Sequence, residues 1–419
     1  MADGKTEART GAEDAVASDS AAAATSGPVA PETDVTPQVA AASSAEPASA
    51  ASASAPAAPV ASDAPVALAA PAYGADPSWL VETTRRLVAV DSTVGYYAQI
   101  EPVLAQMVGE LGFGLTRDYK HTCYVRVPGR DRTRSVCLGA HLDTIGFIVR
   151  GFNDDGTLRV RRLGGINWAS AEGECVRIHC RDGRTVTGQL ICDHHSVHVW
   201  KDAKDLPRDE DHMSVSVVGD VSSADEARAL GITQGAIVSV DPHFEAFGNG
   251  YVVSRHIDDK ACVAALLGCL RWIRDTGFVP ACDVLMAFPI FEEIGHGGAF
   301  VPDGVTEYVA LDITLIGPDY DADEHSVGVI ASDYYSVYDW DLTNRLIACA
   351  ERTFAPGEWN TQVCFNYGTD ASAAYTKGAN VAAGAFGPAC LSSHGRERCH
   401  ADAIARTQRL ACAYVESLG

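Results

Sequence analysis

Hydrophobic positions along the chain follow two periodicities, and the order of the two predicts the fold. Apolar residues recur three or four positions apart from 100 to 111 and from 263 to 273, and Gly112 and Gly277 close these two predicted helices. Unbroken apolar runs of strand length lie between such helices, and the run from 284 to 291 is the clearest. Strands that alternate with helices are typical of an α/β domain. We therefore expect a mixed sheet flanked by helices.

The pattern changes between residues 148 and 252. Short apolar runs are separated there by Gly, Asp and Ser turns, and a helical piece at 223–230 interrupts them. Many short strands with turn signals predict a small β-barrel or β-sandwich. We expect an inserted β-rich domain at 148–252 and a larger α/β domain built from two segments, 73–147 and 253–419.

The first 72 residues consist mostly of Ala, Ser, Pro, Thr, Asp and Glu. Such a sequence lacks the large apolar side chains that offset the entropy lost on ordering, so we expect residues 1–72 to form a disordered tail. No basic segment followed by an apolar run opens the chain, so a secretory signal peptide is not expected.

Charge and cysteine usage restrict the class of protein. The chain has 419 residues and a net charge of −23. Nucleic acid and anionic membrane surfaces are excluded as partners, because they require basic patches. No apolar stretch is long enough to span a membrane. The 13 cysteines form no CxxC pair and many lie in apolar runs, so we interpret them as reduced, buried residues of a cytoplasmic protein.

Two adjacent acids, Glu292 and Glu293, end the apolar run at 284–291, and three glycines follow within five residues. Burying a charge is costly unless it is paired or bound to metal, and ligands of open α/β sheets bind beyond the carboxyl ends of strands. Successive strand residues point to opposite sides. We therefore expect one acid to be a metal ligand and the other a general base, with the glycines leaving room for the backbone to approach metal or substrate. Taken alone, this stretch is better explained by a strand end in solvent.

Further acids and histidines follow four other predicted elements: His141 with Asp143, Asp258 beside Asp259, Asp312, and His394. Helix capping explains one acid of the 258–259 pair. Together with Glu292 and Glu293, however, there are five such groups without Lys or Arg, and capping hardly explains all of them. Imidazoles and carboxylates without thiolates suit Zn²⁺, Co²⁺ or Mn²⁺. Two histidines, two acids and one shared acid predict a two-metal hydrolase in which each metal keeps an open position.

The motifs, taken in order, resemble the tetrahedral (TET) family of di-metal aminopeptidases, also called the glutamyl aminopeptidase/endoglucanase-like family. The resemblance covers about residues 79–417 and rests on the segments 140–146, 257–260, 291–299, 311–312, 368–371 and 393–400. The β-rich insert falls where this family carries its dimerisation domain. The resemblance implies dimers and, at the family's largest, a tetrahedral dodecamer.

The resemblance also implies two metal ions per subunit, Zn²⁺ or Co²⁺ in the first place and Mn²⁺ as a further candidate. One metal would be held by His141, Asp258 and Asp312. The other would be held by Asp258, Glu293 and His394, so that Asp258 bridges the two. The peptide bond after Asp258 would be cis, as in related di-metal peptidases.

Two catalytic roles follow from the same resemblance: Glu292 would be the general base, and Asp143 would orient His141. The family has Arg where this chain has Lys260, and His296 replaces a bulkier, more basic pattern. We expect His296 to lie in the pocket wall or behind the ligands. Glu397 and His400 are expected at the start of the last helix.

The expected activity is removal of N-terminal residues from short peptides, with a metal-bridged water activated by Glu292. Two alternatives stay open: a related di-metal amide hydrolase, either a deacylase or a carboxypeptidase, and a non-catalytic scaffold with a relict metal site. A glycosidase is disfavoured, because it needs a carboxylate pair across a sugar cleft rather than a histidine-bearing set.

Overall fold

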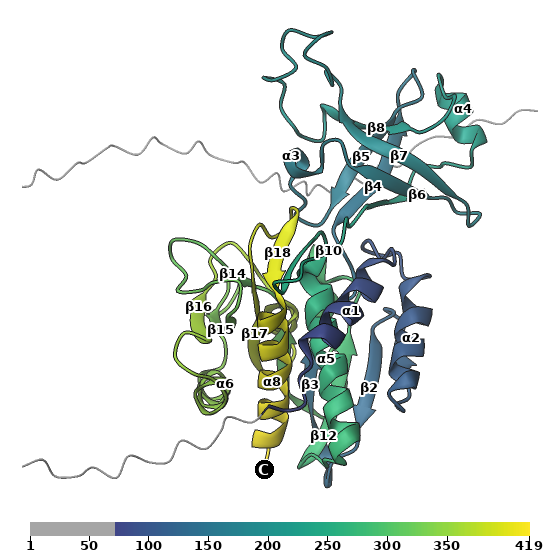
Figure 1. Cartoon of the computed structure of the whole chain (residues 1–419). Helices are drawn as coiled ribbons and strands as arrows, with labels where there is room; N and C mark the ends of the chain where they lie inside the picture. The colour runs from purple at the N-terminus through teal and green to yellow at the C-terminus, as the bar shows by residue number, and fades with distance from the viewer. Residues whose placement is uncertain (1–71) are drawn as a thin grey trace, which may run out of the picture. The chain divides into compact units, whose positions relative to one another are not determined.

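The computed structural model describes residues 72–419 (Figure 1). The expected disordered tail, residues 1–72, lies outside the described residues except for Ala72. Within the described part of the chain, no helix combines the length and the apolar character needed to cross a membrane.

A mixed sheet of nine strands forms the centre of the larger domain. Its order is β1-β2-β12-β3-β13-β17-β15-β16, with β14 paired to β17. The strands are β1 (Thr116–Arg117), β2 (Cys123–Val127), β3 (Asp131–Gly139), β12 (Cys282–Phe288), β13 (Val305–Leu311), β14 (Thr314–Leu315), β15 (Val327–Ser332), β16 (Trp359–Val363) and β17 (Ala382–Cys390). The four central strands β12, β3, β13 and β17 run parallel. Their carboxyl ends therefore meet at one edge of the sheet.

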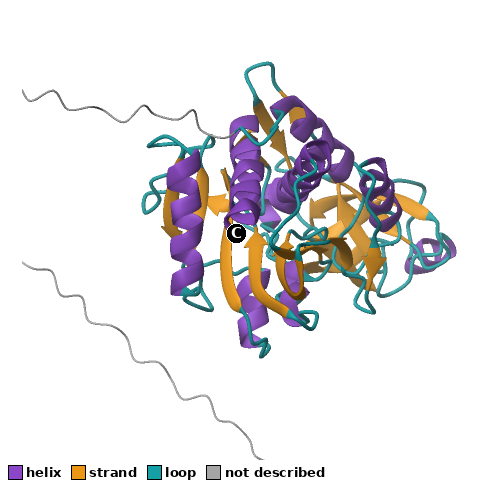
Figure 2. Ribbon diagram, turned by 90° about the horizontal axis from the view of Figure 1, so that it is seen from below, coloured by secondary structure: helices purple, strands orange, loops and turns teal. Residues whose placement is uncertain are grey.

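Helices cover the sheet, and Figure 2 shows them in purple beside the orange strands. They are α1 (Pro77–Val88), α2 (Ile100–Glu110), α5 (Ile257–Thr276), α6 (Trp340–Thr353), α7 (Asp370–Thr376) and α8 (Ala401–Ser417). The longest, α5, packs against α1 and α8. Gly277 ends α5 in the left-handed conformation, with φ of 65°, which glycine adopts without a Cβ clash.

The apolar run of β12 is unbroken because both of its faces are buried. Val284, Met286 and Phe288 join the core on the side of α5 and α8. Leu285 and Ala287 point the other way, into a smaller cluster that includes residues of α7. Each fully buried side chain of this size stabilises the fold by roughly 1.5–3 kcal/mol. This two-sided burial fixes where the strand ends, and so where the acids after it lie.

The β-rich insert is a closed six-stranded barrel, which decides between the barrel and the sandwich that the sequence allowed. Its strands, in order around the barrel, are β4 (Gly146–Phe152), β5 (Leu158–Leu163), β8 (Met213–Val217), β7 (Thr185–Cys192), β6 (Cys175–His179) and β9 (Ile237–Val240). Two short helices, α3 (Trp168–Ala171) and α4 (Ala224–Ala229), belong to the same segment. A separate apolar core fills the barrel.

One expectation about the last helix was wrong. Glu397 and His400 do not lie in it but form a short strand, β18 (Glu397–His400), which pairs antiparallel with β11 (Tyr251–Ser254). A two-residue strand, β10 (Glu245–Ala246), completes this sheet. The partner strand is about 150 residues away in sequence, so local periodicity carries no sign of the pairing. His400 accepts a hydrogen bond from Asp402 N and so caps α8.

Candidate active site

The two glutamates after β12 lie on a 3-10 turn, η1 (Glu292–Ile294), and not on the strand itself. The strand ends at Phe288 because Pro289 has no N–H to donate to the sheet. We expected the alternation of side chains along a strand to direct the two acids to opposite sides. This reason was wrong, because neither residue lies on the strand. The turn separates them instead, and the Asp143 carboxylate holds it by accepting hydrogen bonds from Glu292 N (3.2 Å) and Glu293 N (3.1 Å).

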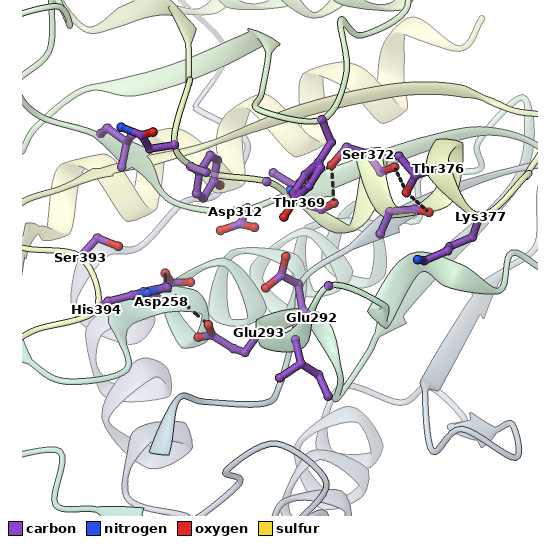
Figure 3. A pocket seen from close by; sticks show the side chains of 18 residues that line it. Asp258, Glu292, Glu293, Asp312, Thr369, Ser372, Thr376, Lys377, Ser393 and His394 are labelled. Atoms are coloured by element: carbon purple, nitrogen blue, oxygen red, sulfur yellow. Dashed lines mark hydrogen bonds and ion pairs between the residues drawn. The ribbon is translucent and has the colours of Figure 1, made fainter. Parts of the chain in front are cut away.

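All the expected site residues come together at the carboxyl edge of the sheet. They follow β3, β12, β13 and β17 or begin α5: His141, Asp143, Asp258, Glu292, Glu293, Asp312 and His394. Five of them, Asp258, Glu292, Glu293, Asp312 and His394, line one cavity of about 660 Å³. Figure 3 shows the carboxylates of Asp258, Glu292, Glu293 and Asp312 converging in its middle.

Asp258 lies between the two histidines. Its Oδ1 atom is 3.2 Å from His141 Nε2, and its Oδ2 atom is 3.6 Å from His394 Nε2. The peptide bond from Asp258 to Asp259 is cis, as the resemblance implied. One carboxylate therefore offers a separate oxygen to each half of the cluster.

The two glutamates divide between the same halves. Glu292 Oε2 is 3.7 Å from His141 Nε2, and Glu293 Oε2 is 3.4 Å from His394 Nε2. Asp312 has a carboxylate oxygen within 4.8 Å of ligand atoms on both His141 and Glu292. The arrangement thus has a side around His141, Glu292 and Asp312 and a side around His394 and Glu293.

His141 is held by main-chain and side-chain groups together. Its Nδ1 atom is 3.0 Å from the backbone oxygen of Asp143 and 3.5 Å from that residue's carboxylate. His141 N donates to Asp259 Oδ2 at 3.0 Å. Lys260, fully buried, donates from Nζ to Ser92 Oγ (2.6 Å) and to the oxygen of Leu142, and so supports the loop that carries His141.

Three positioning groups were not found by sequence reasoning. Glu397 accepts hydrogen bonds from Asp258 N (3.1 Å) and His394 N (3.2 Å), so one carboxylate holds the backbone of both residues. Asp259 is the second, through the hydrogen bond that it accepts from His141 N. Gly165, in the segment after β5, leaves room for His394: a Cβ there would lie 2.6 Å from His394 Nδ1. Spacing could have pointed to Glu397, three residues after His394, but nothing in the sequence points to Gly165.

The electrostatics of the cluster favour a bound cation. Burial, followed by repulsion among the neighbouring acids, raises the pKa of Glu292, Glu293 and Asp312 well above the usual range. Burial also raises the pKa of Asp258, but His141 outweighs it and brings that pKa below its ordinary value. Burial would lower the pKa of His141, yet the adjoining carboxylates raise it overall. Asp259 Oδ1 is buried without a hydrogen-bond partner.

These donors fit divalent cations of the zinc type. The set offers imidazole nitrogens and carboxylate oxygens on two sides, and none of the candidate metal-binding groups among the described residues includes a cysteine. Positive charge between the carboxylates would remove the cost of gathering them in a buried place. The chemistry of the residues present therefore suits bound divalent cations.

Two of the glycines after η1, Gly297 and Gly298, lie against a neighbouring helix. A Cβ on Gly298 would lie 2.0 Å from the backbone oxygen of Asp370, at the start of α7. Gly298 N donates to Asp370 Oδ1 at 2.5 Å. The close approach of these two glycines is thus made to α7, whereas Gly295 lies in the lining of the cavity. His296 stacks on Phe291, with ring centroids 5.0 Å apart, beside the cavity rather than in its lining.

Comparisons with known proteins find matches over most of the chain. The model of the M42 glutamyl aminopeptidase family matches residues 122–410. YhfE of Bacillus subtilis (strain 168), provisionally named an aminopeptidase, is 32% identical over 338 residues, 80% of this chain and 97% of YhfE. Lysyl aminopeptidase of Pyrococcus furiosus is 28% identical over 185 residues, 43% of this chain and 51% of that protein.

Solved structures share the fold. A TET aminopeptidase from a marine-sediment Thaumarchaeota archaeon aligns with a TM-score of 0.71 at 18% identity, over 82% of this chain and 99% of its own. The TET1 peptidase of Pyrococcus horikoshii, which can assemble into a tetrahedron or a large octahedral shell, aligns with a TM-score of 0.70 at 21% identity, over 80% and 99%. These two likenesses show the fold alone, whereas the family match and the relative at 32% identity also show the family. The chain belongs to the M42 glutamyl aminopeptidase family and is a metal-dependent aminopeptidase.

Proposed function

We propose that this aminopeptidase holds two divalent cations and removes the N-terminal residues of short peptides with Glu292 as general base. His141, Asp258 and Asp312 would hold one cation. Asp258, Glu293 and His394 would hold the other. The observation that carries the proposal is the placement of Asp258, whose two oxygens lie 3.2 Å and 3.6 Å from the two histidines.

Two cations bound there would lower the pKa of an attacking water toward neutrality and polarise the scissile carbonyl. Glu292 is placed to take the proton of that water and pass it to the leaving amine, because its carboxylate lines the cavity beside His141. Burial and the acids around it raise its pKa, so its carboxylate takes up a proton more readily than a solvated glutamate does, while bound cations would oppose this shift. Asp143 fixes the turn on which Glu292 lies.

The acidic cavity suits a free α-amino group. Four carboxylates lie along its lining: Asp258, Glu292, Glu293 and Asp312. A free N-terminus brings an amine that carboxylates and cations attract, whereas an acylated one does not. This chemistry favours an aminopeptidase over a deacylase of related fold.

We also propose a homo-oligomer of cytoplasmic location. The barrel, residues 148–252, would be the dimerisation domain, and the TET1 peptidase with its tetrahedral and octahedral assemblies supports larger complexes built from such dimers. All thirteen cysteines are unpaired, as a reducing compartment requires. Native mass determination would decide between a dimer and a dodecamer.

The proposal is tested by metal analysis together with a substrate panel on the size-fractionated protein. We expect two ions per chain, hydrolysis of aminoacyl anilides, and no hydrolysis of N-acyl amino acids or N-terminally blocked peptides. Asp258→Ala should lose both ions, while Asp303→Ala, an exposed acid outside the cavity, should keep them. Two ions retained in Asp258→Ala would refute the bridging role, and cleavage of N-acyl amino acids alone would refute the aminopeptidase assignment for this site.

A further inference from the structure

A second group of side chains with metal-binding chemistry lies outside the cavity of the proposed active site. It consists of His325 in the segment before β15, His400 at the end of β18, and Asp402 in the first turn of α8. One ligand atom of each lies within 4.8 Å of those of the other two. None of the three lines the cavity around Asp258, so the proposed reaction makes no use of them.

The carboxylate of Asp402 faces both imidazoles. Its Oδ2 atom is 3.3 Å from His325 Nδ1 and 3.3 Å from His400 Nδ1. Zinc binds nitrogen and oxygen ligands at about 2.0–2.2 Å in a tetrahedron, which places two ligand atoms roughly 3.4 Å apart. These atoms of the two histidines are therefore already spaced from the carboxylate as ligands of one such ion.

Hydrogen bonds outside the cluster orient the ring of His400. In its neutral form, Nε2 donates to the backbone oxygen of Asn249 at 2.9 Å, and Nδ1 accepts a hydrogen bond from Asp402 N at 3.1 Å. Nδ1 then faces the carboxylate of Asp402 with a lone pair and no proton to share. A cation between these two acceptors would relieve their repulsion. A backbone oxygen on the second ring nitrogen is also the usual support of a metal-bound histidine.

The ring of His325 has a comparable partner. Its Nε2 atom is 3.4 Å from Tyr251 Oη, which leaves Nδ1 to face Asp402. The centroids of the His325 and His400 rings are 3.9 Å apart, so two protonated imidazoles would repel each other there. Neutral imidazole is the form that binds divalent cations. His400 is buried, whereas His325 and Asp402 are partly exposed, so solvent reaches one side of the cluster.

One neighbouring cation moderates the affinity. Arg406 Nη1 lies 4.0 Å from Asp402 Oδ2 and donates to the backbone oxygen of His325 at 2.6 Å. Its Nη2 atom donates to Glu358 at 2.6 Å, so Glu358 is its closer carboxylate partner. A bound ion would also replace Asp402 N as the partner of His400 Nδ1. We therefore expect an ion that exchanges with solvent more readily than those of the buried acidic cluster.

We propose that His325, His400 and Asp402 bind one divalent cation of the zinc type, with water completing its coordination, at a structural site separate from the catalytic centre. The inference does not rest on the proposed function. The ion would join the segment before β15, the end of β18 and the start of α8. Because β18 also carries Glu397, which holds the backbone of two residues of the active site, binding would stabilise the strand that supports the catalytic residues.

Equilibrium dialysis of the full chain against Zn²⁺ tests the site. The ion should be lost on size fractionation and return when Zn²⁺ is supplied, in addition to the ions of the catalytic centre. Loss of an outer partner of a metal ligand weakens affinity by 10–100-fold, so removing a ligand in His325→Ala should weaken it by about 100-fold or more. At a Zn²⁺ concentration that just fills the wild type, this variant should bind one ion fewer. Mg²⁺ should not compete, because it prefers oxygen ligands.

Two further comparisons separate this site from the catalytic centre. The difference of one ion should also appear between Asp258→Ala and the double variant Asp258→Ala/His325→Ala, since the two sites share no ligand. His198→Ala removes an exposed histidine of the barrel segment and should bind as many ions as the wild type. Added Zn²⁺ should raise the thermal midpoint of His198→Ala as it does that of the wild type, and raise that of His325→Ala less.

Equal numbers of bound ions in the wild type and His325→Ala overturn the inference. An equal rise of their thermal midpoints with Zn²⁺ overturns it as well. Far-UV circular dichroism shows whether His325→Ala is folded, and if it is not, Asp402→Asn decides by the same measurements. Two ions retained in Asp258→Ala would count against the proposed catalytic centre and leave this comparison intact.

Discussion

At the residue scale, the site depends on acids with different neighbours. Asp258 contacts both histidines, whereas Glu292 lies near His141 and Glu293 near His394. A turn thus directs neighbouring residues of one sequence motif to separate sides of the cluster. The proposed base is the acid that is not needed to hold a cation.

Glu292→Gln tests this division. Gln keeps the size and the hydrogen-bonding turn but cannot take a proton, so we expect kcat to fall by about 10²–10⁴-fold with both ions retained. Glu351→Gln, on the exposed surface of α6, is the control and should keep full activity. Steady-state kinetics and elemental analysis of the same samples measure both quantities. Near-normal turnover in Glu292→Gln would remove this residue from the mechanism.

At the element scale, the site depends on how a short segment packs against a helix. The second 3-10 turn after β12, η2 (Gly297–Ala299), lies on the start of α7. Asp370 accepts a hydrogen bond from Gly298 N, and Lys120 reaches the same turn through the oxygen of His296. The turn therefore fixes both Glu292, just before it, and the start of α7.

Gly298→Ala should disturb this contact. The added Cβ would meet the Asp370 backbone oxygen at 2.0 Å, and we expect a loss of about 1–3 kcal/mol in the free energy of unfolding. Gly109→Ala is the control: Gly109 lies within α2 with open space around it, so Ala should stabilise the protein by about 0.5–1 kcal/mol. Urea denaturation measures both. Unchanged stability of Gly298→Ala would show that α7 moves freely away from the turn.

At the scale of the whole molecule, the acids of the site reduce the stability of the folded state. Burial raises the pKa of Glu397 to about 8, with Asp258 adding to the effect. Burial likewise raises the pKa of Asp370 to about 7. Below these values the folded protein holds the protons more tightly than the unfolded chain does. The free energy of unfolding therefore decreases as the pH rises toward these pKa values, unless cations compensate the charge.

The metal-free protein should show this dependence, and Glu397→Gln isolates one contribution. Relative to the variant, the wild type should lose stability as the pH rises from about 5 to about 8 and then level off, because Gln cannot ionise. His256 and Lys260 have lowered pKa values, about 3 and about 7, with opposite slopes, but they are common to both proteins and cancel. Denaturant titrations across this pH range provide the measurement. Parallel stability curves for the two proteins would show that Glu397 titrates normally.

The sequence by itself determined the fold class, and it predicted a candidate set of ligands for the site. Periodicity predicted α2 and α5 and the β-rich character of 148–252, because these depend on which face of each segment is buried. The types of candidate ligand could be predicted as well. Burying acids and histidines at the ends of strands costs free energy unless these groups are paired or bind a cation. Order and spacing of the motifs then identified the family.

Tertiary structure decided what depends on distant partners. It closed the barrel, paired β18 with β11, and brought Glu397 and Gly165 to the ligands. It also placed Glu292 and Glu293 on a turn held by Asp143 instead of on the strand. Local spacing records which side chains are buried and charged, whereas their contacts are set by the packing of the whole domain.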